Sequence, residues 1–484
     1  MTVVSSRLVD LVNDLRKLPD ECEWVELKVG NADPDVIGKR LSALSNGARL
    51  MDKQKGYLVY GVADKTREVV GTKFKGGTEK VKGQQLQYWL SKELDPCPDI
   101  QYFEIDHTGK RVVVIEIDPA IGVPTKYKST AYIRIGEATP RLSDHREKEQ
   151  ALWRKLQTYS WERAPAATYL AGDRVLDLID ADQCCLLLGE TKPHSKNDAL
   201  AFLRDNKLIV PDVGSNWNIT NKCAVLFAKR MADFPSLDRR QVRLIQYGNE
   251  GRVNAIKEMP VHAGYALSFE WLVDAVVEMV SREDIGTLRL KRALVPRAAI
   301  REAIANAMIH QDMLVTTSVP MIEVFPNRVE IRSPGEPLIE PSRFINAPPQ
   351  SRNEDIASLM RRMDICEERG SGIDRIVTST EGNNLPPPDF SRQDGTTKVI
   401  LFGPQPMSVW TKADLVRACF QHACILSTDG KRATNATLRA RLGLDATQAA
   451  QVSRIFKDAL KGRCIKLADP AAPKGGYVPD FGSA

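Results

Sequence analysis

The sequence predicts a multidomain protein of mixed α/β and α+β class. A chain of 484 residues exceeds what one hydrophobic core organises, so roughly two to four domains are expected. Apolar residues recur in some segments at period two, typical of strands, and in others at period 3.6, typical of helices. Residues 401–484 carry 12 Lys and Arg against 6 Asp and no Glu, so the whole net charge of +6 lies there. This segregation indicates a basic C-terminal domain that contacts nucleic acid, although ordinary surface solubility would give the same excess.

Bulk composition excludes several protein classes. With 43% hydrophobic and 27% charged residues, the chain has the composition of a globular protein. Its nine cysteines are scattered without a Cys-x-x-Cys pair, which argues against a zinc ribbon and a secreted disulfide framework. We therefore expect reduced thiols and a cytoplasmic location. Residues 1–18 resemble an amphipathic helix rather than a signal peptide, and no run of about 18 apolar residues predicts a membrane span.

Residues 1–146 predict a compact α/β domain. Residues 24–29 alternate apolar and charged side chains, which indicates a half-buried strand. Asp33 and Pro34 are suited to begin a helix that runs to about residue 50. The nearly continuous apolar run at 56–62 predicts a central strand. The remaining elements expected here are a helix at 84–94 and strands at 100–105, 111–117 and 131–135.

The middle of the chain divides into two further regions. Residues 147–291 predict an intermediate α/β region whose pattern indicates no function. Its expected elements are helices at 175–179, 199–208 and 268–280, a strand at 241–247, and a helix end or strand at 221–227. Residues 292–403 predict a third domain with helices at 297–311, 353–363 and 373–379 and strands at 321–325, 328–332 and 397–402.

Residues 404–484 predict a winged helix-turn-helix. The pattern gives helices at 411–424, 436–442 and 446–460, followed by short strands at 464–467 and 476–478. The third helix of such a domain normally enters the major groove of DNA. Arg454, Lys457 and Lys461 recur on it at spacings of three and four and are the candidate nucleic-acid contacts.

An acidic cluster lies near the N-terminus. Glu21 and Glu26 are five residues apart, and Asp64 follows the strand at 56–62. Carboxylates that converge at strand ends are suited to hold Mg²⁺ or Mn²⁺ in a phosphodiesterase, with Lys28 offsetting the developing charge. The alternative is a solvated strand face with ion pairs.

A second polar constellation lies on the helix at 297–311. Glu302 and Asn306 are four residues apart and share one face of an otherwise apolar helix, which suits Mg²⁺ with a nucleotide phosphate. Gly370 and Gly372 open the helix at 373–379, where backbone N–H groups can meet phosphate. The alternative is a polar stripe at the start of a helix. His310 is expected to be a structural partner of this helix, since it lacks the clustering of a metal site.

The first region resembles the Schlafen/AlbA_2 domain over about residues 15–140. The blocks that carry the resemblance are 21–28, 37–46, 56–62 and 70–71. It implies an AlbA/Schlafen-like fold in which Glu21, Glu26 and Asp64 form the metal triad of a nuclease. It further implies a structured RNA such as tRNA as substrate, although many bacterial members are DNA-binding regulators.

The third region resembles the GHKL (Bergerat-type) ATPase module, an α/β sandwich. The resemblance implies ATP as ligand, Glu302 as the residue that orients or deprotonates water, and Asn306 as the Mg²⁺ ligand. It places Gly335 in the preceding glycine turn and Arg352 at the phosphates, within a mobile lid at 338–367. The adenine-contacting Asp of the family is Ser333 here, which weakens this contact. Resemblance also implies a homo-oligomer.

These patterns lead to three hypotheses about function. The first is a metal-dependent nuclease that acts on RNA and is gated by nucleotide binding or by oligomerisation. The second is an ATP-binding transcriptional regulator that binds DNA without cleaving it. A third and weaker hypothesis is a scaffold in which both sites are degenerate.

Overall fold

The computed structural model describes residues 2–18, 22–30, 33–76, 78–285, 289–345, 347–348, 350–366, 371–472 and 475–482. It divides into two compact units: unit 1 is Met1–Val175 with Leu203–Thr220, and unit 2 is Leu176–Phe202 with Asn221–Ala484. The mixed α/β, multidomain class is thereby confirmed. The finer boundaries after residues 146, 291 and 403 stay predictions.

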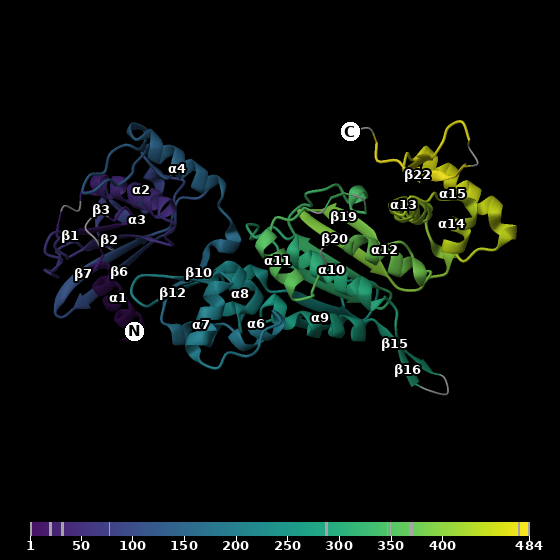
Figure 1. Ribbon diagram of the computed structural model, residues 1–484, viewed down its shortest axis with the longest axis horizontal. Coiled ribbons are helices and arrows are strands. Elements are labelled where there is room, and N and C mark those ends of the chain that lie inside the picture. Colours follow the sequence, from purple (N-terminus) through teal and green to yellow (C-terminus); the bar gives the residue numbers. More distant parts are fainter. Residues whose placement is uncertain are drawn as a thin grey trace. The chain divides into compact units, whose positions relative to one another are not determined.

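A four-stranded sheet in the order β1-β2-β7-β6 forms the centre of unit 1 (Figure 1). Strands β1 (Val25–Lys28) and β2 (Gly56–Tyr60) are parallel, while β7 (Lys110–Ile117) and β6 (Ile100–His107) continue the sheet antiparallel. Helix α1 (Thr2–Leu15) packs on one face and helices α2 (Pro34–Leu50) and α3 (Leu86–Glu93) on the other. Asp33 caps α2 as expected, because its carboxylate accepts from the backbone N–H groups of Asp35 and Val36.

The rest of unit 1 contains short elements. A second sheet has the order β10-β12-β11. The bounds of these elements are β3 Lys80–Val81, β4 Gln84–Gln85, β5 Leu94–Asp95, β8 Lys126–Tyr127, β9 Thr130–Ala131, α4 Arg146–Gln157, β10 Pro165–Leu170, β11 Ile209–Pro211 and β12 Trp217–Thr220.

The bounds of two predicted elements in the first half of the chain were wrong. The strand expected at 131–135 is reduced to β9, because the chain turns back between Ile135 and Ala138 with Gly136 at φ 54°. The helix expected at 199–208 is α7 (Lys196–Asp205), and it stops early because Lys207 adopts φ 56°, outside the helical region.

Unit 2 is built on a six-stranded sheet in the order β14-β13-β17-β18-β20-β19. Helix α10 (Arg297–Ile309) packs against β18 and β20, and α12 (Gly372–Gly382) lies beside α10 on the same face (Figure 1). The strands are β13 Arg243–Tyr247, β14 Ala255–Pro260, β17 Met321–Phe325, β18 Arg328–Pro334, β19 Asp389–Gln393 and β20 Thr396–Phe402. The other helices are α5 Gly172–Leu178, α6 Ala181–Leu187, α8 Asn221–Phe227, α9 Tyr265–Met279 and α11 Glu354–Arg362, with α5 beginning in unit 1.

Two features complete unit 2. Strands β15 (Ser281–Ile285) and β16 (Arg289–Ala293) form a hairpin that projects from the sheet and its helices (Figure 1). The C-terminal segment, here called the tail, has three helices followed by a strand pair, in the order the sequence predicts. These elements are α13 Lys412–Thr428, α14 Asn435–Arg441, α15 Ala449–Lys461, β21 Ile465–Leu467 and β22 Tyr477–Pro479. Among the helices that the structure describes, none is long and apolar enough to cross a membrane.

Candidate functional site

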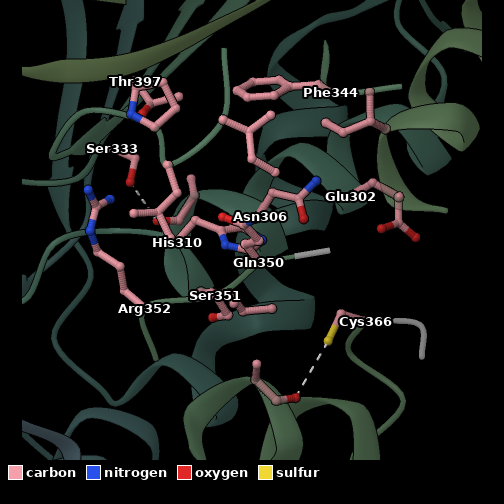
Figure 2. Close-up of a pocket in the computed structure, with 18 of the residues that line it drawn as sticks. Glu302, Asn306, His310, Ser333, Phe344, Gln350, Ser351, Arg352, Cys366 and Thr397 are labelled. Carbon is pink, nitrogen blue, oxygen red and sulfur yellow. Dashed lines mark hydrogen bonds between the residues drawn. The ribbon is translucent and has the colours of Figure 1, made fainter. Parts of the chain in front are cut away.

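A cavity of about 830 Å³ opens beside α10 in unit 2. Its walls come from α10, α11, α12, β18 and β20, and from the segment around Phe344 (Figure 2). Cavities of 300–1,000 Å³ are typical of small-molecule and cofactor sites. Its size and its mixture of apolar and polar walls suit a nucleotide.

The predicted polar face of α10 lines this cavity. Glu302, Asn306 and His310 follow one another at intervals of four residues and all contribute to its wall. Glu302 is almost fully buried, at 3% exposure, and its Oε1 lies 2.9 Å from Nη1 of Arg375 on α12. Figure 2 shows Asn306 in the middle of the cavity. Its amide oxygen is a hard donor that fits Mg²⁺, which would neutralise phosphate charge when bound.

The start of α12 comes very close to these two residues. A Cβ atom added to Gly372 would lie 2.9 Å from Oε2 of Glu302 and 3.4 Å from Nδ2 of Asn306. A side chain at this position would therefore displace the carboxylate of Glu302, while its contact with Asn306 would be an ordinary van der Waals contact. Gly370, the other glycine of the motif, lies outside the described residues.

Two hydroxyl groups form the inner wall of the cavity (Figure 2). Ser333 Oγ donates to the carbonyl of Ala307 at 2.9 Å, and Thr397 Oγ1 donates to the carbonyl of Gly335 at 3.0 Å. Both hydroxyls keep acceptor lone pairs for a ligand. Gly335 itself, at φ 95°, turns the chain after β18 beside Asp312.

Arg352 and two titratable groups, His310 and Cys366, also line the cavity. Arg352 donates to the carbonyl of Glu336 at 2.7 Å and lies 4.0 Å from a carboxylate oxygen of Asp312, so it lines the cavity without a close ion pair to either acid. Desolvation in the cavity wall, together with the charge of Arg352, lowers the pKa of His310, so its ring is neutral at pH 7. Burial raises the pKa of Cys366 to about 11, so its thiol stays protonated and is a poor nucleophile.

Asp374, two residues into α12, carries a buried carboxylate oxygen that has no hydrogen-bond partner among the described residues. Burial raises its pKa to about 6, whereas Asp in an unfolded chain titrates near 3.9. The folded protein thus binds the proton of the Asp374 carboxyl group more tightly than the unfolded chain does. We therefore expect the free energy of unfolding to decrease as the pH rises from about 4 through about 6. Because Asp374 is half-exposed, the loss amounts to about 1 kcal/mol.

Urea unfolding at pH 4.5 and 7 measures this effect. Asp374→Asn is expected to remove that part of the pH dependence, while the same change at the exposed Asp198 leaves it intact. An unchanged pH profile in Asp374→Asn would contradict the assignment.

The structure brings three of the N-terminal site residues together in unit 1. Nζ of Lys28 lies 2.6 Å from Oδ2 of Asp64 and 3.7 Å from Oε1 of Glu26. They meet because β1 and β2 are parallel and their carboxyl ends share one edge of the sheet. Glu21 lies outside the described residues.

Sequence reasoning missed two arginines at this site. Nε of Arg40 lies 3.0 Å from one carboxylate oxygen of Glu26, and Nη1 of Arg134 lies 2.9 Å from the other. Arg40 was detectable, because it stands on the apolar stripe of its helix, three residues after Ile37 and four before Leu44. Arg134 lies in the segment 131–135 that the sequence predicts as a strand, but the structure has irregular chain at this position, and no local pattern links it to Glu26.

This arrangement does not fit a metal site as it stands. Each carboxylate oxygen of Glu26 is already paired with a guanidinium group, so a cation would have to displace one of them. Among the described residues, which exclude Glu21, no three His, Cys, Asp or Glu side chains are grouped to hold a metal ion.

The predicted nucleic-acid contacts of the tail lie on one exposed face of α15. Arg454, Lys457 and Lys461 are exposed, whereas Val452, Ile455, Phe456 and Ala459 of the same helix are buried in the core of the tail.

Family comparison places two known domains on this chain. Residues 21–143 match the Schlafen AlbA_2 family. Residues 318–401, which run from just before β17 to the penultimate residue of β20 and exclude α10, match the family HATPase_c_4, whose description is "Putative ATP-dependent DNA helicase recG C-terminal". The chain carries an AlbA_2 domain and an ATPase-like module. These domains indicate a nucleic-acid-related, ATP-binding function.

Other comparisons add little to this assignment. The crystal structure of the DIP2311 protein from Corynebacterium diphtheriae is 17% identical, with a TM-score of 0.41, over 98% of this chain and 84% of that one. No curated protein matches the chain.

Proposed function

We propose that this protein binds nucleic acid through its AlbA_2 domain and its tail, and that a nucleotide in the α10 cavity controls this binding. The observation that carries the proposal is the cavity, in which Glu302 and Asn306 of α10 converge with Gly372, and Gly372 lies within the residues 318–401 that match the ATPase-like family. The proposal treats the six-stranded sheet with α10 and α12 as a GHKL-type sandwich. It treats the tail as a winged helix, on the basis of its three helices and strand pair.

Calorimetric titration of the full chain with Mg-ADP tests the nucleotide part. We expect saturable binding with one nucleotide per chain. A chain that binds neither Mg-ADP nor Mg-ATP, while its thermal unfolding shows a folded protein, would contradict the proposal.

A basic segment next to Asp64 supports nucleic-acid binding by the AlbA_2 domain. Residues 65–82 contain six Lys and Arg against two Glu. The lysines of this segment are exposed, and within the described residues no carboxylate pairs with them; they are Lys65, Lys73, Lys75, Lys80 and Lys82. Tyr88, 54% exposed on the following helix, adds an aromatic ring on which a base can stack. Exposed lysines beside an aromatic ring suit a single-stranded nucleic acid, since the lysines can contact its phosphates and the ring can stack on a base.

Charge reversal tests this surface. Lys80→Glu with Lys82→Glu is expected to weaken binding of single-stranded RNA about tenfold or more, and to reduce the slope of log K against log salt by about 1.4 if two phosphate contacts are lost. The control reverses two exposed lysines elsewhere in unit 1, Lys126 and Lys207. Equal effects of the two pairs would show that only net charge matters.

A metal-dependent nuclease that acts on RNA is the second candidate, favoured by the meeting of Glu26, Lys28 and Asp64 beside this basic segment. Incubation with tRNA, single-stranded RNA and single-stranded DNA plus Mn²⁺ tests it. Cleavage that persists in Glu26→Gln would rule out this site as its source.

A homo-oligomer stays a prediction, and light scattering of the purified chain would check it.

A further inference from the structure

Helix α12 contacts the nucleotide cavity at one end and the tail at the other. Its first residues, Gly372 and Ile373, line the cavity, and Glu381 in its last turn pairs with tail side chains. At 1.5 Å per residue, the helix carries this connection over about 15 Å.

At the cavity end, α12 is held by Glu302 of α10. Arg375 and Glu302 form an ion pair at 2.9 Å, in which the Glu302 side chain is 4% exposed and the Arg375 side chain 43%. Glu302 lines the cavity, so Mg²⁺ bound there would compete with Arg375 for its carboxylate, since a hydrated cation attracts a carboxylate. Nucleotide binding would therefore change the ion pair that holds α12 at the cavity.

At the tail end, Glu381 holds two side chains of different helices. One of its oxygens lies 3.2 Å from Nε of Arg441, and the other lies 3.2 Å from Nδ1 of His422. The Arg441 side chain is 2% exposed and also donates to the carbonyl of Leu385 at 2.9 Å. Because this guanidinium is buried, moving its carboxylate partner away would leave an uncompensated charge, so the tail must follow α12.

An apolar contact reinforces the link between the two ends. Ile373 lines the cavity and also packs in a cluster with Val377 of α12 and with Phe420 and Cys424 of α13. The tail also reaches the cavity wall near Phe344, because Phe481 lies under the guanidinium of Arg343 at 5.0 Å.

We propose that α12 couples the cavity to the tail: Mg²⁺ and nucleotide bound at Glu302 weaken its pair with Arg375 and reposition α12, and Glu381 passes this movement to the tail through Arg441 and His422. This coupling rests on the proposed nucleotide binding, and it identifies the tail as the part of the protein that the nucleotide regulates. Linkage requires reciprocity, so a tail repositioned by nucleic acid must change the nucleotide affinity by the same factor.

Hydrogen exchange of the full chain, with and without saturating Mg-ADP, tests the coupling without any substitution. We expect amides of α13 and α14, neither of which lines the cavity, to exchange about fivefold more slowly with Mg-ADP, because α12 is then anchored by its ligand. Glu381→Gln removes the charge that holds the tail and leaves the cavity walls intact. In this variant Mg-ADP is expected to bind with unchanged affinity and to leave tail exchange unaltered.

His422→Ala serves as a milder second variant, since it leaves the Glu381–Arg441 pair in place and is expected to reduce the response in part. Thr378→Ala, at an exposed position of α12, is the matched control and keeps the full response. Binding of Mg-ADP without any change in tail exchange overturns the coupling alone. An undiminished response in Glu381→Gln overturns the role of Glu381, and absence of Mg-ADP binding overturns the proposed function as well.

Discussion

Replacing Arg134 with methionine is expected to destabilise unit 1 by about 3 kcal/mol, as judged by urea unfolding. The side chains of Arg134 and Glu26 are both only 3% exposed, so removal of the guanidinium leaves a buried carboxylate with less compensation. The cost falls at the low end for a broken buried pair, because Arg40 still contacts the other oxygen of Glu26.

A double-mutant cycle separates this effect from general loss of packing. Glu26→Gln combined with Arg134→Met is expected to cost about 1–3 kcal/mol less than the sum of the two single changes. Arg111→Met provides the control, since Arg111 is 42% exposed and lies 3.9 Å from Glu104, so its loss should cost less than about 1 kcal/mol. Additive single effects at Glu26 and Arg134 would show that the pair has no special energetic role.

The same paired arginines explain what the sequence could and could not predict in unit 1. The meeting of Glu26, Lys28 and Asp64 followed from local rules, because alternation along a strand and the shared edge of parallel strands are both visible in the chain. The ion pairs of Glu26 are contacts between elements far apart in sequence. Arg134 lies 108 positions further on, in a segment whose expected strand shrank to two residues.

The candidate site in the α10 cavity was more predictable, because three of its polar side chains lie on or directly after one helix. Glu302, Asn306 and His310 share a face by helical periodicity alone, and this face is the one that lines the cavity. Arg375 was not predicted as the partner of Glu302, since the pair requires the packing of α12 beside α10. Likewise, the hydrogen bond that the Ser333 hydroxyl donates to the carbonyl of Ala307 depends on how α10 packs over β18, which the sequence does not show.

Replacing Asn306 with alanine is expected to weaken binding of Mg-ADP about 100-fold, or about 2.7 kcal/mol, as measured by calorimetry. Its amide lines the centre of the cavity and is the oxygen donor placed one helical turn from Glu302. The described residues show no hydrogen bond made by this side chain, so we expect the folded protein to lose less than about 1 kcal/mol of stability. A large loss of affinity with little loss of stability is the signature of a ligand contact.

The metal dependence of that loss distinguishes a Mg²⁺ ligand from a group that contacts the nucleotide directly. With EDTA in place of Mg²⁺, ADP should bind the wild type and Asn306→Ala with nearly equal and weak affinity, because the interaction that the substitution removes is then absent from both. Asn306→Asp keeps an oxygen donor and is expected to retain most of the Mg²⁺-dependent affinity. If Asn306→Ala weakened ADP equally with and without Mg²⁺, Asn306 would bind the nucleotide itself, and the metal would have to be held elsewhere in the cavity.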